Sequence, residues 1–211
     1  MIDSKQKIAK LLLQINAIKL NPAKPFTWAS GWKSPIYCDN RKTLSFPLIR
    51  KEIVSCFADI IQNKYKEIDG VAAVATGAIG MGALVASELN LPMVYIRAAA
   101  KGHGLENRIE GSYEKNQRYV VIEDLISTGN SSLSAVNALR DSGCKVLGMV
   151  AIFSYNFQTA VDNFLKSECK LDVLSDYDTL IELAIESNII DAKYLEILKE
   201  WRQNPSTWMQ E

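Results

Sequence analysis

Histidine and cysteine are scarce in this sequence, and neither sign of charge is in excess. One His and four Cys occur among the 211 residues, and no two Cys form a C-x-x-C pair. Zinc sites and disulfide frameworks use closely spaced ligands of these types, so the sequence indicates neither. The 24 Lys and Arg balance the 24 Asp and Glu, which argues against a general nucleic-acid binder. We expect no nucleic-acid partner.

The sequence also lacks a recognisable targeting or membrane segment. Up to Ile15 the N-terminal residues alternate Lys with apolar side chains, which is typical of an amphipathic helix and not of a signal peptide. Residues 70–87 carry no charge, but their four glycines and Thr76 favour a strand, a turn and a buried helix over a membrane span. We therefore expect no membrane partner. The scattered thiols fit a reducing compartment, so we expect a cytoplasmic protein.

From residue 70 onward, short apolar runs alternate with segments of helical periodicity. The chain is long enough for one core and an appendage. Alternation of this kind is typical of an α/β fold with a twisted, mostly parallel sheet and right-handed crossovers. Before it, residues 26–39 alternate small, aromatic and polar types around Gly31 and Pro35, which predicts a hairpin. We expect strands at 71–76, 93–97, 119–124, 145–153 and 171–174, and helices at 47–63, 81–90, 131–142, 177–187 and 191–203.

The most informative stretch runs from Tyr119 to Ser132. Its first residues, up to Ile122, are uncharged, as in a central parallel strand covered on both faces. Glu123 and Asp124 follow at the carboxyl end, where open α/β sheets bind ligands. Adjacent carboxylates are good acceptors for the vicinal hydroxyls of a ribose. Residues 127–132 then offer hydroxyls, a Gly and the unsatisfied amides of a helix N-terminus, which together predict a site for a ribose 5′-phosphate.

The same residues allow other interpretations. A strand that ends in Glu-Asp before an ordinary Ser/Thr helix cap would look similar without binding a ligand. A Walker loop is not indicated, because no Lys follows Gly129. A dinucleotide site is not indicated either, because no G-x-G-x-x-G opens this helix.

A second informative segment, residues 97–111, interrupts the alternation of strands and helices. It holds three glycines, the cations Arg97, Lys101 and Arg108, and His103, the one histidine of the chain. A polar segment of this length inside a compact α/β domain is usually functional or disordered. Its positive charge suits an anionic substrate and a departing pyrophosphate. A solvated loop without a role is the alternative.

Three segments, in this order, resemble the orotate phosphoribosyltransferases, a family of type I phosphoribosyltransferases. They are Ser-Gly-x-x-Ser-Pro at 30–35 with Tyr37, Arg-x-x-x-Lys-x-His-Gly at 97–104, and the motif at 122–132. The resemblance covers essentially the whole chain. It implies a type I phosphoribosyltransferase core, with a small hood from the N-terminal region and part of the C-terminal region. The implied division is 1–66 for the N-terminal helix and hairpin, 67–175 for the core, and 176–211 for the C-terminal helices.

The resemblance also implies an activity and its partners. The reaction is the Mg²⁺-dependent transfer of the phosphoribosyl group from phosphoribosyl diphosphate (PRPP) to orotate, in pyrimidine biosynthesis. A homodimer is implied, with the 97–111 loop donated to the neighbouring active site. The implied catalytic residues are Lys101 and Asp124, and no protein metal ligand is expected. The implied substrate-binding residues are Arg97, Lys101, His103, Glu123, Asp124, Ser127, Thr128, Gly129, Asn130, Ser131, Ser132 and, stacking on the pyrimidine, Tyr37.

The chain departs from the family pattern where cations are common. Ala98 follows the loop Arg where many members have Lys, and Ala29 stands in the hairpin where some have Lys. The turn at 75–80, with Ile79, lacks a further Lys, and Tyr155 or Asn156 replaces an orotate-contacting Arg. Backbone amides of the turn are able to bind anions in their place. A phosphoribosyltransferase for another base, and a regulatory protein that senses PRPP and binds RNA or DNA, are the alternatives.

Overall fold

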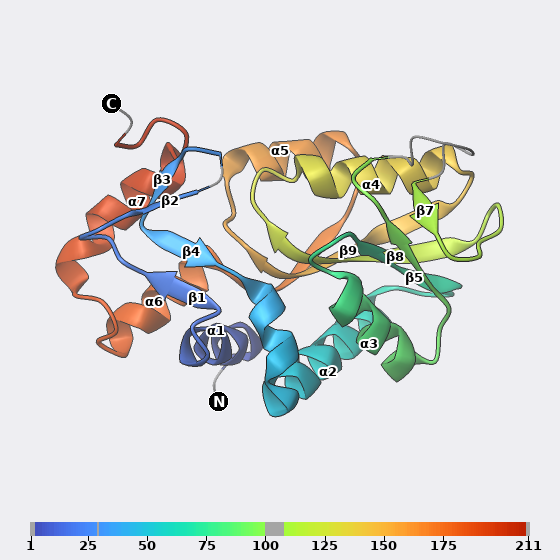
Figure 1. Cartoon of the computed structure of the whole chain (residues 1–211), viewed down its shortest axis with the longest axis horizontal. Helices are drawn as coiled ribbons and strands as arrows, with labels where there is room; N and C mark the ends of the chain where they lie inside the picture. The colour runs from blue at the N-terminus through green and yellow to red at the C-terminus, as the bar shows by residue number, and fades with distance from the viewer. Residues whose placement is uncertain (1–2, 29, 100–107, 210–211) are drawn as a thin grey trace.

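A six-stranded sheet forms the centre of the computed structural model, which describes residues 3–28, 30–99 and 108–209 (Figure 1). The strand order is β10-β9-β8-β5-β6-β7. Neighbouring strands are parallel except for β6 and β7, which are antiparallel. The strands are β5 (Gly70–Val74), β6 (Met93–Ile96), β7 (Ile109–Glu110), β8 (Arg118–Ile126), β9 (Lys145–Ser154) and β10 (Leu171–Asp176).

Helices cover both faces of this sheet. Figure 1 shows α4 (Asn130–Asp141) and α5 (Gln158–Lys166) on one face, and α2 (Pro47–Lys64) and α3 (Ile79–Leu89) on the other. Side chains of β8 alternate between the two layers, because successive strand residues point to opposite faces. Val120 and Ile122 join the hydrophobic core under α2 and α3, whereas Val121 joins the core under α4.

The remaining elements form a smaller unit at one end of the sheet, which we call the hood. Its strands pair as two antiparallel ribbons, β1 (Ile18–Leu20) with β4 (Ile36–Cys38) and β2 (Phe26–Thr27) with β3 (Lys33–Ser34). Figure 1 shows the C-terminal helices beside these ribbons. The hood helices are α1 (Ser4–Gln14), α6 (Tyr177–Glu186) and α7 (Leu195–Gln203), with the 3₁₀ helices η1 (Asn40–Ser45) and η2 (Ala192–Tyr194).

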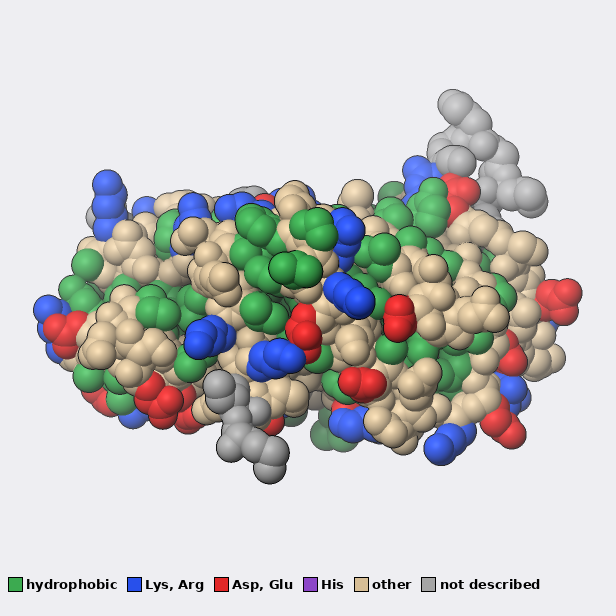
Figure 2. Space-filling view, turned by 90° about the horizontal axis from the view of Figure 1, so that it is seen from below, with side chains coloured by type: hydrophobic (Ala, Val, Ile, Leu, Met, Phe, Trp, Pro, Cys, Tyr) green, Lys and Arg blue, Asp and Glu red, His purple; other side chains and the backbone are tan. Residues whose placement is uncertain are grey.

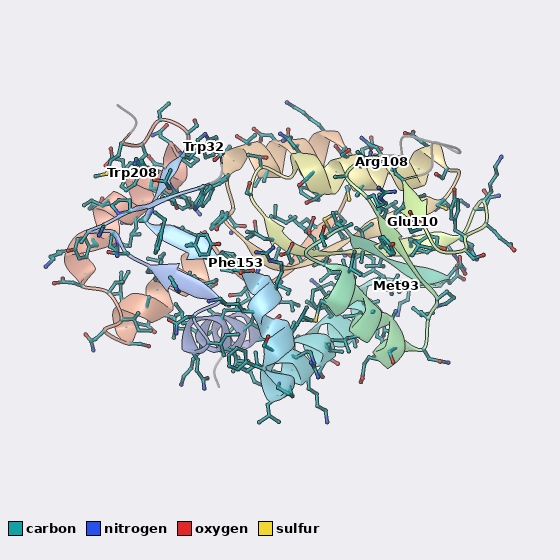
Figure 3. The ribbon with its side chains drawn as sticks, viewed as in Figure 1. Trp32, Met93, Arg108, Glu110, Phe153 and Trp208 are labelled. Carbon is teal, nitrogen blue, oxygen red and sulfur yellow. The ribbon has the colours of Figure 1, made fainter. Side chains whose placement is uncertain are left out.

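Trp201 joins the two ends of the chain within the hood. Its side chain is fully buried, and its Nε1 donates a 3.2 Å hydrogen bond to the carbonyl of Lys33. Its ring meets that of Trp28 edge to face at 5.7 Å. In Figure 3, Trp32 and Trp208 also lie at this hood end of the molecule. Burial of such large aromatic surfaces fixes the hairpin against the C-terminal helix.

The predicted α/β fold with a mostly parallel sheet is confirmed. The hairpin is also present as β2 and β3, with Gly31 at a φ of 87° between them. Strands β1 and β7 and helices η1 and α5 were not predicted. Strand β7 has only two residues, too few to show a period, and α5 follows β9 in a segment for which no helix was expected.

The surface on the side of α1, α2 and α3 carries both signs of charge. Figure 2 shows Lys and Arg interspersed there with Asp and Glu and with hydrophobic side chains, in keeping with a net charge of zero. Across the described ranges, no helix is both long and apolar enough to cross a membrane.

Candidate active site

Glu123 and Asp124 lie near the carboxyl end of β8, as predicted, and they differ in environment. Glu123 is 5% exposed, and its two oxygens accept hydrogen bonds from Ser132 Oγ at 2.7 Å and from the Asp124 N–H at 2.9 Å. Burial, and then the charge of Asp124, raise the pKa of Glu123 well above its usual range. Asp124 is only half-buried. It is therefore the more accessible carboxylate of the pair.

Three separate segments meet at Asp124. The Nδ2 of Asn40, in η1, donates a 2.6 Å hydrogen bond to the Asp124 carbonyl. On another side, the turn between β5 and α3 approaches so closely that a Cβ on Gly77 would lie 2.5 Å from Asp124 Oδ2. The amides of Thr76 and Gly77 donate no hydrogen bond within the described chain. A turn with unbonded amides beside a carboxylate pair suits a phosphate group attached to the sugar.

The predicted phosphate loop, residues 127–132, runs from the end of β8 into α4. Gly129 begins the helix at a φ of 80°, and Leu133 is the first residue whose N–H bonds back to it, at 2.9 Å. The amides of Asn130, Ser131 and Ser132 therefore precede the first intrahelical bond, at the positive end of the helix dipole. The Ser132 hydroxyl is turned to Glu123, so this residue offers its amide rather than its hydroxyl.

Helix α5 holds this loop in place, which sequence reasoning missed. Asn163 Nδ2 donates hydrogen bonds of 3.0 Å to the Thr128 carbonyl and to Asn130 Oδ1. A Cβ on Gly129 would lie 2.8 Å from the ring of Phe164. Thr128 N–H is also fixed, since it bonds to Ser127 Oγ at 2.6 Å. Nothing in the local sequence pairs residues so far apart, so only the packing of α5 on α4 reveals the support.

The two ends of the predicted loop 97–111 lie side by side. Arg97 N–H donates to the Arg108 carbonyl at 2.8 Å, and Arg108 Nε donates to the Arg97 carbonyl at 2.9 Å. Arg108 also reaches α4, donating to Ser134 Oγ at 3.0 Å. Figure 3 shows Arg108 and Glu110 at the end of the molecule opposite the hood, where Glu110 pairs with the Arg97 guanidinium at 3.4 Å. Lys101 and His103 lie outside the described residues.

The loop ends enclose a small cavity at the carboxyl edge of the sheet. Its volume is about 190 Å³, large enough for a phosphate group. Arg97 and Arg108 contribute the cations, and Ala98, which follows the loop Arg, also lines the cavity. Ser131 of the phosphate loop forms part of the opposite wall. The cavity thus connects the loop ends to the phosphate loop.

The hood contributes an aromatic and an ion pair. Tyr37 is 41% exposed and its ring lies 5.8 Å from that of Phe26. Arg41 Nε donates to Asp39 Oδ1 at 2.7 Å, and this contact lowers the pKa of Asp39. The hydrogen bond to Asp39 and its charge raise the pKa of Arg41, and the charge of Asp124 adds a smaller effect. Arg41 is a cation that sequence reasoning overlooked, although it directly follows the hairpin.

The replacements of the family Arg are now distinguishable. Asn156 Nδ2 points to Asp178 Oδ2 of α6, at 3.5 Å, and its N–H bonds to Ser154 Oγ at 3.0 Å. Tyr155 is 2% exposed within an aromatic cluster. Ala29 lies outside the described residues. Among the residues that are described, no group of three His, Cys, Asp or Glu side chains is placed to hold a metal ion.

Comparison with known proteins identifies the family. The model of the phosphoribosyl transferase domain matches residues 43–185. Orotate phosphoribosyltransferase of Porphyromonas gingivalis is 55% identical over 201 residues, which cover 95% of this chain and 96% of that protein. The chain belongs to the orotate phosphoribosyltransferase family. The corresponding protein of Phocaeicola vulgatus is 52% identical, with 95% of this chain and 94% of that protein covered.

Solved structures of the family share this fold. Orotate phosphoribosyltransferase from Aeropyrum pernix superposes with a TM-score of 0.74 at 26% identity, covering 83% of this chain and 96% of that one. Leishmania donovani UMP synthase gives a TM-score of 0.77 at 25% identity, covering 94% of this chain and 43% of that longer one. The family resemblance seen in the three sequence segments is confirmed.

Proposed function

We propose that this chain transfers the 5-phosphoribosyl group of PRPP to orotate, giving orotidine 5′-monophosphate and pyrophosphate in UMP biosynthesis. The observation that carries the proposal is the junction of β8 and α4. There a carboxylate pair, Glu123 and Asp124, lies directly before a helix N-terminus with open amides. This arrangement supports a ribose with its hydroxyls on the carboxylates and its 5′-phosphate on residues 127–132.

Asp124 and Glu123 have unequal parts in this proposal. Each carboxylate oxygen has about two acceptor sites, so the bonds that Glu123 receives from Ser132 and Asp124 leave capacity for a sugar hydroxyl. Asp124, with more of its surface open, takes the second hydroxyl and faces the reacting end of the sugar. Tyr37, exposed on the hood, stacks on the pyrimidine.

The chemistry needs charge stabilisation and no covalent nucleophile. The bond from C1 to pyrophosphate breaks ahead of attack by orotate, so positive charge builds on the ribose ring and negative charge on the leaving group. Arg97 lines the cavity beside the phosphate loop, which supports our assignment of its charge to that leaving group. We assign Lys101 and His103 the same task from the loop motif. Preorganised charges of this kind commonly lower a barrier by several kcal/mol.

Mg²⁺ fits the donors at this site. Mg²⁺ prefers oxygen ligands, keeps several waters and is commonly held through substrate phosphates with one or two carboxylates. The described residues at the site offer the carboxylates of Glu123 and Asp124 and the hydroxyls of Ser127 and Thr128. Asp124 is the residue that would approach an ion carried on PRPP. The ion would neutralise charge on the departing pyrophosphate.

The proposed assembly follows from the same family resemblance, and the proposed location from the scattered thiols. We propose a cytoplasmic homodimer in which residues 97–111 of each subunit complete the neighbouring site. The division into 1–66, 67–175 and 176–211 belongs to the same proposal. Arg97 and Arg108 fix both ends of this segment beside the phosphate loop.

One assay tests the activity. Orotate absorbance is followed with PRPP and Mg²⁺, with uracil, adenine and hypoxanthine as parallel substrates and Asp124→Asn as the inactive control. We expect loss of substrate with orotate alone. Turnover of another base instead would contradict the substrate, and PRPP binding without any turnover would favour the regulatory alternative.

A separate assay tests the shared site. Subunits with Lys101→Ala are mixed with subunits with Asp124→Asn, under conditions where subunit exchange is verified by a tag on one of them. We expect activity to recover, since one intact site in a mixed dimer combines a normal loop with a normal carboxylate pair. No recovery would mean that the loop serves its own subunit.

A further inference from the structure

Tyr155 occupies a fixed position where the hood meets the core. It directly follows β9, and its N–H donates a 3.0 Å hydrogen bond to the carbonyl of Ile126, at the end of the strand that carries the carboxylate pair. In Figure 3 the nearby Phe153 lies at the centre of the molecule, between hood and core. The rings packed around Tyr155 are those of Trp28 at 5.1 Å, Phe157 at 5.3 Å, and Phe153 and Trp201 at 5.7 Å.

The hydroxyl of Tyr155 has no hydrogen-bond partner within the described chain. Buried phenols usually find one, and three others here do so. Tyr177 donates to the Leu198 carbonyl at 3.0 Å, Tyr65 to Asp172 at 2.8 Å and Tyr119 to Gln117 at 2.9 Å. No wholly buried polar side-chain atom among these residues lacks a partner. The Tyr155 oxygen must therefore sit at an opening in an otherwise buried side chain.

Ionisable groups of both the hood and the core act on this phenol. Burial raises the pKa of Tyr155 well above its usual range, and the groups that add to the effect are Cys38, Tyr177, Tyr37 and Asp124. Tyr37 belongs to the hood and Asp124 to the core, so the phenol lies within electrostatic reach of the stacking residue and of a ribose carboxylate. A phenol in this setting stays protonated at neutral pH and keeps a proton to donate.

We propose that the Tyr155 hydroxyl donates a hydrogen bond to an oxygen of the pyrimidine substrate and so helps to select it. This inference rests on the proposed function. Orotate presents two ring carbonyls and a carboxylate, all acceptors, to such a donor. The surrounding rings hold the phenol in place before binding, so little side-chain freedom is lost when the bond forms.

Tyr155→Phe tests this, because it removes only the hydroxyl and keeps the ring packing. A hydrogen bond to a charged or strongly polar acceptor is worth about ten- to a hundredfold in binding. We expect the KM for orotate to rise by about tenfold or more, with the KM for PRPP and kcat changed little, as for an interaction equal in ground and transition states. Calorimetry with orotate alone should show the same loss of affinity.

Tyr177→Phe is the matched control, because it deletes a buried phenol hydroxyl in the same aromatic cluster. Its partner is a backbone carbonyl of α7, so we expect a lower melting temperature and an unchanged KM for orotate. Equal orotate kinetics for Tyr155→Phe and wild type, or equal shifts in both variants, would overturn the inference. Failure of the wild type itself to use orotate would instead overturn the proposed function.

Discussion

Asn40 and Asp124 are joined by a hydrogen bond of 2.6 Å, from the Asn40 carboxamide to the Asp124 backbone carbonyl, across 84 positions of sequence. Asn40 is 1% exposed, and its Oδ1 accepts from the Cys38 thiol at 3.2 Å, which fixes the orientation of the amide. The bond ties the segment that follows the hairpin to the strand that carries the carboxylates. The position of Asp124 therefore depends on a residue far from the motif.

Asn40→Ala should weaken both stability and catalysis. Loss of the amide leaves the Asp124 carbonyl without this donor, which typically costs about 1–3 kcal/mol. We expect that loss in urea unfolding, together with a higher KM for PRPP. Asn137→Ala, on the exposed side of α4, is the control and should change neither. Wild-type kinetics in Asn40→Ala would show that the strand end holds its geometry without this contact.

Gly77→Ala should displace the Asp124 carboxylate. The added Cβ would lie 2.5 Å from Oδ2, closer than any real contact allows. Because hydrogen bonds to a carboxylate are worth about 1.5–3 kcal/mol, we expect PRPP affinity to fall by about tenfold or more, measured by calorimetry. Gly80→Ala is the control, since its Cβ would meet only the end of the flexible Leu44 side chain at 2.9 Å. Similar affinities in the two variants would contradict this account.

Glu123→Gln should change how stability depends on pH. An acid with a raised pKa in the folded state binds more protons folded than unfolded. The free energy of unfolding of the wild type therefore falls as pH rises from the ordinary glutamate pKa through the raised one, by at most about 1.4 kcal/mol per pH unit. Glutamine does not titrate, so the variant should lose this contribution and gain stability relative to wild type as pH rises.

Urea unfolding of wild type and Glu123→Gln between pH 5 and pH 8 measures this difference, with Glu196→Gln on an exposed turn of α7 as control. Parallel curves for Glu123→Gln and wild type would mean that Glu123 is ionised in the folded protein throughout that range.

Lys101→Ala should lower turnover far more than it weakens PRPP binding. The ammonium meets negative charge that grows only as pyrophosphate departs, so its contact strengthens in the transition state. Removal of one such group commonly costs about 10² to 10³ in kcat. Steady-state kinetics give kcat, and calorimetry gives PRPP affinity. An unchanged kcat would remove Lys101 from the catalytic assignment.

The fold was predictable where a local pattern repeats. The uncharged run before Glu123 and the 3.6-residue spacing of the helices identified the sheet and most of its layers. Strand β7 and helix α5 were not predicted. The two residues of β7, Ile109 and Glu110, are too few to show the alternation of a strand. Of the site, the carboxylates and the phosphate loop were predictable because strand end and helix start are adjacent in sequence. Asn40 and Asn163 were not, because their partners are distant in the chain. Arg41 pairs locally with Asp39, but its proximity to Asp124 arises only on folding.

The sequence by itself determined the fold class, the family and the order of carboxylates and phosphate loop, since each of these depends on patterns of residues that are contiguous in the chain. Only the tertiary structure decided which carboxylate is buried, where Ser132 points and how Tyr155 and Asn156 pack. These choices depend on burial and on hydrogen bonds between segments that the chain brings together only on folding. Tyr155 and Asn156 are neighbours in sequence, yet packing buries the first in an aromatic cluster and leaves the second hydrogen-bonded to Asp178.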